Sequence, residues 1–156
     1  MKIYLIAVGQ RIPGWIEQGY QEFAKRLPRD CRFVLIEIAT GKRRKNSDTS
    51  RLVEREGKQI SAAIPRSSTV IALDINGQHW STMQLAKRLD TWRQQGRDIA
   101  ILVGGPDGLA PDCLARARYV WSLSNLTLPH ALVRILVAEQ FYRAWCITRD
   151  HPYHRG

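Results

Sequence analysis

A chain of 156 residues, 44% hydrophobic and 24% charged, has the size and composition of one globular domain, so we expect residues 1–156 to fold together without a disulfide framework. Its net charge of +10 points to nucleic acid or another polyanion, with solubility alone as the simpler alternative. Three widely spaced cysteines fit reduced thiols, and no stretch reads as a secretory signal or a membrane span, so we expect a cytoplasmic protein without membrane contact.

Strand-like and helix-like segments alternate along the chain. In chain order, the apolar patterns predict a strand at 2–8, a helix at 13–27, a strand at 32–39, a helix at 49–63, a strand at 69–75, a helix at 82–95, strands at 99–103 and 119–123, and a helix at 129–147. Regular alternation of this kind predicts an α/β fold, a mainly parallel sheet flanked by helices.

A run of four cations, Lys42, Arg43, Arg44 and Lys45, follows the second predicted strand. It lies in the stretch from Lys25 to Arg66, which holds twelve basic and five acidic residues and so supplies +7 of the net charge. Lys and Arg side chains displace condensed counterions from nucleic acid, so we interpret the run as a loop that contacts RNA phosphates. The alternative is a solvated surface loop.

Two loops after the last two predicted strands have the character of a ligand site. Gly104-Gly105-Pro106-Asp107-Gly108 follows one strand, and Ser124-Asn125-Leu126-Thr127-Leu128 follows the other. In open α/β sheets, ligands bind beyond the carboxyl ends of the strands. The loops offer backbone that a ligand can approach closely, but neither dinucleotide nor P-loop spacing and no metal-ligand pattern. Ordinary turns remain the alternative for the glycine-rich loop.

The last predicted helix is apolar on two sides. Val133, Leu136, Val137, Phe141 and Trp145 share one side, and Leu132, Ile135, Tyr142 and Cys146 share another. A helix that is apolar on two sides is buried on two sides, which predicts packing on the sheet and on a second subunit of a homodimer. At the beginning of this helix, His130 is expected to cap the helix or to form a hydrogen bond.

The whole chain resembles the SPOUT-class rRNA methyltransferases, and most closely the small single-domain family (RlmH) that methylates N3 of a pseudouridine in bacterial 23S rRNA. The resemblance is carried by the motifs GGPDG, WSLSNLTLPHALVRILVAEQFYRAW and HPYHR, and less specifically by KIYLIAVG, GKRRKN and LDINGQHWS. It implies a C-terminal trefoil knot, an exception to the rule against threading, and an enzyme that acts on the ribosome as a homodimer with S-adenosylmethionine as cofactor and no metal. It implies cofactor contacts by Leu73, Gly104, Leu123, Ser124, Asn125, Leu126, Thr127 and Leu128.

The C-terminal tail, from His151 to Gly156, is expected to complete the active site. Tyr153 can stack on a base, His154 is largely neutral at pH 7 and could accept the imino proton, and Arg155 could stabilise the resulting anion. Relatives in the resembled family share the Tyr-His-Arg ending. A non-catalytic basic RNA-binding or ribosome-associated protein is the main alternative function, and it explains the charge without explaining the two loops. A nucleotide-binding hydrolase would need a G-x-S-x-G or P-loop motif that the sequence lacks.

Overall fold

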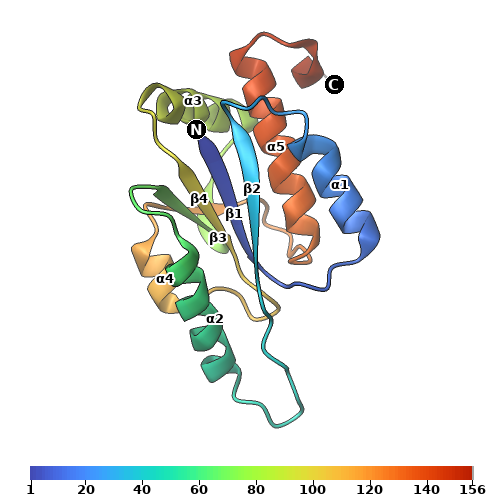
Figure 1. Cartoon of the computed structure of the whole chain (residues 1–156), viewed down its shortest axis with the longest axis vertical. Helices are drawn as coiled ribbons and strands as arrows, with labels where there is room; N and C mark the ends of the chain where they lie inside the picture. The colour runs from blue at the N-terminus through green and yellow to red at the C-terminus, as the bar shows by residue number, and fades with distance from the viewer. Residues whose placement is uncertain (156) are drawn as a thin grey trace.

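Five strands form a parallel sheet at the centre of the molecule, in the computed structural model, which describes residues 1–155 (Figure 1). Gly156, the last residue of the expected domain and tail, lies outside the described residues. The sheet order is β2-β1-β4-β3-β5. The bounds are β1 Lys2–Val8, β2 Arg32–Ile38, β3 Thr69–His79, β4 Ile99–Val103 and β5 Tyr119–Ser122. Each of the four described pairings is parallel, so the predicted sheet is confirmed.

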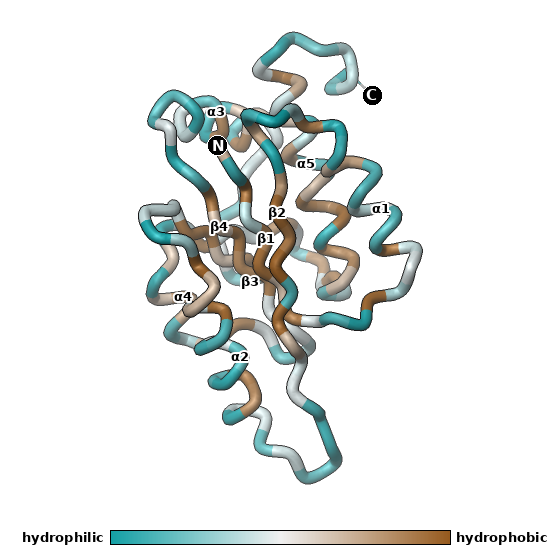
Figure 2. Tube along the Cα trace, viewed as in Figure 1, coloured by the Kyte–Doolittle hydropathy of each residue, from teal (hydrophilic) through white to brown (hydrophobic). Residues whose placement is uncertain are grey.

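Helices cover both faces of the sheet. One face carries α1 (Gly14–Ala24), α3 (Thr82–Gln94) and α5 (Leu132–Thr148), and the other carries α2 (Thr49–Ala63) and α4 (Pro111–Arg116) (Figure 1). Strand β1 explains the two layers, because successive side chains point to opposite faces: Leu5 packs in the core with α1, α3 and α5, and Ile6 packs in the core with α2 and α4. The apolar strands are sandwiched accordingly between helices with polar outer sides (Figure 2). The sequence reading did not include α4, whose first residue is a proline.

Strand β3 is longer than predicted and contains an irregularity beside the later site. Leu73 and Gln78 both pair with Trp121, so the segment from 74 to 77 bulges out of the ladder. Within it, the Asn76 backbone N–H donates to the Asp74 carboxylate over 2.8 Å, a side-chain contact that stabilises a turn. A Cβ atom on Gly77 would lie 2.6 Å from the Val120 carbonyl oxygen, so the strand resumes beside β5 only because this residue is glycine.

Helix α5 lies between α1 and α3 and contacts both helices. Its second apolar side therefore does not by itself require a second subunit. A Cβ atom on Gly19 would lie 2.6 Å from the Ile135 Cδ1 atom, so α1 and α5 are in close contact. Much of the second apolar side is therefore covered within the same chain. The homodimer stays a prediction, and it needs support other than the pattern of this helix.

Several other expectations concern the whole fold. The trefoil knot and the single domain stay predictions. Cys31, Cys113 and Cys146 are free and buried, as expected of reduced thiols. Within residues 1–155, no helix has the length and apolar character needed to cross a membrane.

Candidate functional site

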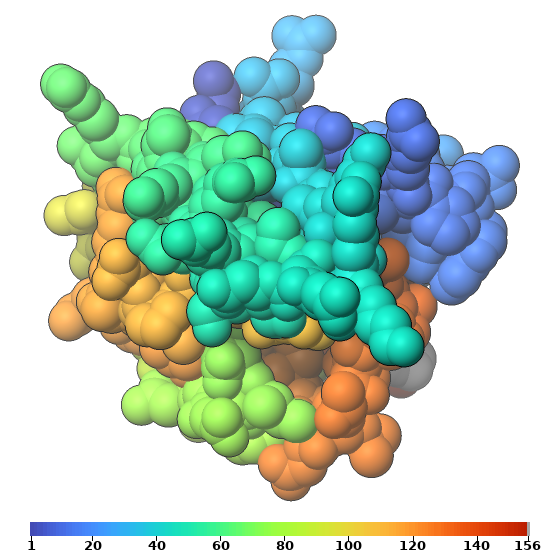
Figure 3. Space-filling model, turned by 90° about the horizontal axis from the view of Figure 1, so that it is seen from below, coloured from blue at the N-terminus to red at the C-terminus, as the bar shows by residue number. Residues whose placement is uncertain are grey.

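A pocket of about 360 Å³ lies at the carboxyl ends of β3, β4 and β5. Its volume is within the range of small-molecule sites, and its position is the one expected for a ligand in an open α/β sheet. Figure 3 looks onto this end of the molecule, where the surface is hollowed below the turquoise loop that follows β2. The lining residues are Leu73, Asp74, Ile75, Val103, Gly104, Gly105, Pro106, Gly108, Trp121, Ser122, Leu123, Ser124, Leu126, Thr127, Leu128, His130 and Val133.

The pocket brings together seven of the eight residues that the sequence assigned to cofactor binding. These are Leu73, Gly104, Leu123, Ser124, Leu126, Thr127 and Leu128. Asn125, the eighth, is exposed and does not line the pocket. The sequence analysis missed the contribution of the β3 bulge, where Asp74 and Ile75 reach the pocket because the chain leaves the ladder there. The dipeptide Asn76-Gly77 was the available signal.

The glycine-rich loop is a tight turn whose shape depends on its own backbone. The Gly108 N–H donates to the Gly105 carbonyl oxygen over 3.1 Å, with Pro106 at the second turn position, where proline is favoured. Gly108 alone of the three loop glycines has a positive φ, +81°. A Cβ atom on Gly104 would lie 2.5 Å from the Gly108 carbonyl carbon. Gly104 also lines the pocket, so closure of the turn is a further reason why this position needs glycine, and its contact with a ligand stays a prediction.

Hydrogen bonds of two serines shape the second loop beside the pocket. The buried Ser122 hydroxyl donates to the Ser124 carbonyl oxygen over 3.0 Å, and the Leu126 N–H donates to the Ser124 hydroxyl over 3.0 Å. These bonds leave Leu126 as a large apolar side chain that lines the pocket while 73% exposed. The arrangement suits a flat apolar ligand edged by backbone polar groups.

His130 is a pocket residue whose expected role is corrected by the structure. Helix α5 begins at Leu132 and has no side-chain cap, so His130 does not cap it. Its Nδ1 atom is buried and has no hydrogen-bond partner among the described residues. Burial lowers the pKa of His130, and the Arg134 and Arg43 cations lower it further, so the ring is neutral near pH 7. A neutral imidazole with a free nitrogen is a group to which a bound ligand can form a hydrogen bond.

A buried arginine fixes the helix beside His130. The Arg134 side chain donates to the Glu37 carboxylate over 2.7 Å and to the Gly9 carbonyl oxygen over 2.7 Å. These contacts join α5 to the carboxyl ends of β1 and β2. Since Arg134 is 1% exposed, it acts from within the fold and holds the pocket wall in place.

The four cations of the basic loop do not form one set. Arg43 is partly buried and forms ion pairs with Glu56 and Asp107, whereas the side chains of Lys42, Arg44 and Lys45 form none within the described part of the chain. Hydrogen bonding to Glu56 raises the pKa of Arg43, with a further contribution from Asp107. The sequence showed no acidic neighbour before Asp48, because both carboxylates come from distant parts of the chain.

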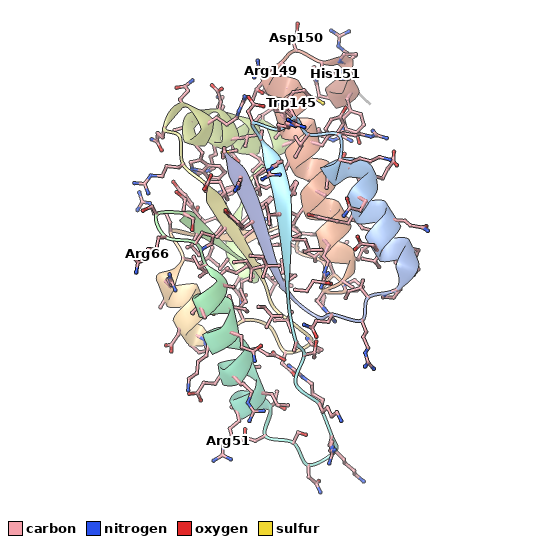
Figure 4. The ribbon with its side chains drawn as sticks, viewed as in Figure 1. Arg51, Arg66, Trp145, Arg149, Asp150 and His151 are labelled. Carbon is pink, nitrogen blue, oxygen red and sulfur yellow. The ribbon has the colours of Figure 1, made fainter. Side chains whose placement is uncertain are left out.

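The expected catalytic tail lies far from the pocket of its own chain. Residues Pro152–Arg155 form a 3₁₀ turn after α5, where Tyr153 donates from its hydroxyl to Glu139 over 3.1 Å and packs against Tyr142 at a ring separation of 4.7 Å. Burial, followed by Glu139, raises the pKa of Tyr153. Figure 4 places His151, at the beginning of the tail, at the opposite end of the molecule from Arg51 near the basic loop. The pocket and the tail are thus separated by most of α5, roughly 25 Å for 17 residues. None of Tyr153, His154 and Arg155 lines the pocket.

Across residues 1–155, no three His, Cys, Asp or Glu side chains are grouped so that they could hold an ion.

Comparison with known proteins gives one family and several similar folds. A family model described as a predicted SPOUT methyltransferase matches residues 1–154. A probable methylase family protein from Haemophilus influenzae Rd KW20 is similar with a TM-score of 0.59 and 16% identity, over 97% of this chain and 69% of that chain. TrmJ from Z. mobilis ZM4 gives 0.54 and 18% over 92% and 69%, and a putative methylase family protein from Neisseria gonorrhoeae gives 0.50 and 14% over 90% and 80%. At these identities the structures support the fold alone.

Proposed function

This chain belongs to the SPOUT methyltransferase family, and we propose that it transfers a methyl group from S-adenosylmethionine to N3 of a pseudouridine in bacterial 23S rRNA on the ribosome. Methyltransferases of this family use S-adenosylmethionine. The observation that carries the proposal is the pocket at the ends of β3, β4 and β5, which gathers seven of the residues assigned beforehand from the resemblance.

The pocket residues fit this cofactor chemically. Leu73, Leu123 and Leu128 would hold the faces of the adenine, while the backbone of the two loops would meet its polar edge. The unpartnered Nδ1 atom of His130 is available to a polar group of the cofactor. When bound, S-adenosylmethionine supplies a methyl group on a sulfonium, which is transferred by in-line displacement. The protein's own contribution is to position the two reactants and to keep water out.

The RNA is proposed to meet the same end of the molecule. The basic loop follows β2, and the pocket lies beyond β3, β4 and β5, so both lie at the carboxyl ends of the parallel strands. Lys42, Arg44 and Lys45 are exposed and free of ion pairs among the described residues, as phosphate-contacting side chains must be.

The tail is proposed to act in the pocket of a second subunit of a homodimer. Within one chain, the length of α5 separates Tyr153, His154 and Arg155 from the pocket. A tail that completes an active site must therefore belong to the partner. In that position Tyr153 would stack on the target base, His154 would accept the N3 proton, and Arg155 would stabilise the anion that remains.

A non-catalytic basic RNA-binding or ribosome-associated protein is the alternative. It explains the exposed cations but gives no role to the pocket. Calorimetric titration with S-adenosylmethionine separates the two, because a protein that only binds RNA has no reason to bind it. We expect saturable binding, followed by methyl transfer to large-subunit rRNA from cells that lack this protein, with the product mapped to N3 of a pseudouridine. Binding of RNA without binding of the cofactor would favour the alternative.

A further inference from the structure

We propose that Arg43 is a positioning residue that ties the basic loop to the glycine-rich turn, so that contact of the loop with RNA changes the affinity of the pocket for its cofactor. The inference rests on the proposed function of the pocket and of the loop. It differs from the sequence-based interpretation, in which Arg43 is one of four phosphate contacts.

The guanidinium group of Arg43 is already committed to the protein. Its Nη1 atom donates to the Glu56 carboxylate over 2.5 Å and to the Gly41 carbonyl oxygen over 3.0 Å, its Nη2 atom donates to Glu56 over 3.1 Å, and its Nε atom donates to Asp107 over 2.9 Å. These bonds use four of the five N–H groups that an arginine has. Arg43 therefore has little left to offer a phosphate.

One partner of Arg43 is anchored deep in the fold. Glu56 lies on α2 and is only 3% exposed, and its carboxylate also accepts a hydrogen bond from the Gly41 N–H over 3.2 Å. A buried carboxylate without a cation is strongly unfavourable, so this pair fixes where the basic loop leaves β2. Arg43 thereby joins the basic loop to α2.

The other partner lies in the turn that forms part of the pocket wall. Asp107 is the third residue of the turn from Gly105 to Gly108, and Gly105, Pro106 and Gly108 line the pocket. A Cβ atom on Gly105 would lie 3.7 Å from the Glu56 Oε1 atom, so the turn rests on the same carboxylate that holds Arg43. A shift of the basic loop therefore reaches the turn directly through Arg43.

The flanking cations are placed to drive such a shift. Lys42 and Arg44 are exposed on either side of Arg43. When RNA phosphates draw these side chains toward them, the backbone at Arg43 moves with its neighbours, and its bond to Asp107 carries the movement to the turn that faces the cofactor. By thermodynamic linkage, the cofactor must then strengthen RNA binding by the same factor.

The test is a titration of S-adenosylmethionine into the full chain, with and without purified large-subunit rRNA. For the unchanged protein we expect RNA to strengthen cofactor binding at least threefold. Asp107→Ala breaks the link but leaves the buried pair of Arg43 and Glu56 in place, so the fold should survive. We expect it to weaken cofactor binding about two- to fivefold without RNA, the range for a partly exposed ion pair, and to remove the effect of RNA. Asp112→Ala, which removes an exposed carboxylate from α4, is the matched control and should change neither value.

A second pair of variants separates positioning from phosphate contact. Arg43→Lys keeps the charge but cannot bridge both carboxylates, so it should lose the coupling while the salt dependence of RNA binding stays the same. Arg44→Gln should flatten that salt dependence and leave cofactor affinity without RNA unchanged. The inference is overturned if Asp107→Ala retains the full effect of RNA, or if the unchanged protein binds the cofactor equally well with and without RNA. Failure of the unchanged protein to bind S-adenosylmethionine at all would instead refute the proposed function, and the inference with it.

Discussion

Replacement of Gly104 by alanine should lower either the stability of the fold or the affinity of the pocket for its cofactor, because the added methyl group collides with the closed glycine-rich turn. The added Cβ atom would lie 2.5 Å from the Gly108 carbonyl carbon, 2.7 Å from the Gly108 carbonyl oxygen and 2.8 Å from the Leu109 nitrogen. The first of these is roughly 1 Å inside the ~3.5 Å at which two carbon atoms begin to attract each other. All three atoms belong to the backbone, so no side-chain rotation can relieve the overlap.

The cost of this overlap can be divided between folding and binding. Overpacking of this kind costs about 1–3 kcal/mol. If the free protein keeps the turn closed, the free energy of unfolding falls by that amount. If the turn opens instead, stability is kept, and the same free energy is lost from cofactor binding, which weakens the affinity by roughly 5- to 150-fold. The two losses should therefore sum to about 1–3 kcal/mol.

Both quantities can be measured on the same preparation. Urea denaturation gives the free energy of unfolding, and calorimetric titration with S-adenosylmethionine gives the affinity. Gly14→Ala is the matched control, because among the described residues no atom beyond its chain neighbours and its own helix backbone lies within 4 Å of the Cβ position at Gly14, and its φ is not positive. Wild-type stability together with wild-type affinity in Gly104→Ala would refute the reasoning, since the turn would then accept a side chain at no cost.

Four further outcomes are expected. Replacement of Lys42, Arg44 and Lys45 by alanine should reduce the salt dependence of RNA binding by roughly one unit of slope per lost contact, and an unchanged slope would leave the loop as solvated surface. Truncation after Pro152 should lower methyl transfer by at least about a hundredfold while cofactor binding persists, and full activity would remove the tail from the chemistry. Sedimentation equilibrium should give twice 17.9 kDa, and a monomer at micromolar concentration would contradict a shared active site. Burial raises the pKa of Cys31 to about 11, so its thiol should resist iodoacetamide at pH 8.5 until the protein is unfolded, and rapid alkylation of the native protein would contradict that burial.

Local patterns were sufficient to predict most of the elements. Strands β1 and β4 and helix α2 have the predicted bounds: the two strands are short apolar runs, and the helix is an amphipathic segment. The alternation of strands and helices also predicted a parallel sheet and, through it, a site beyond the carboxyl ends of the strands. The two loops could be assigned to that site because each follows a strand directly, which places both loops at the carboxyl ends of the parallel strands.

Other features depended on partners that are distant in sequence. Arg43 looked like its neighbours until the fold brought Glu56 and Asp107 beside it. The bulge in β3 depends on the close approach of β5. Gly77 permits that approach, but a glycine at this position does not by itself predict a bulge. Local propensity does not describe either effect, because both arise from contacts between elements.

The basic stretch from residue 25 to residue 66 separates what the sequence determines from what the tertiary structure decides. The sequence by itself determined that residues 25 to 66 carry a large positive charge. The structure decided where that charge lies: Arg29 and Arg32 stand at the amino end of β2, and Lys42 and Arg44 follow its carboxyl end, across a strand of seven residues. Because a strand advances about 3.3 Å per residue, the two groups lie at opposite ends of the strands. Only the second group lies at the carboxyl ends, where the pocket is. Composition and order along the chain belong to the sequence, while the partners of each charge are set by the packing of strands and helices from separate parts of the chain.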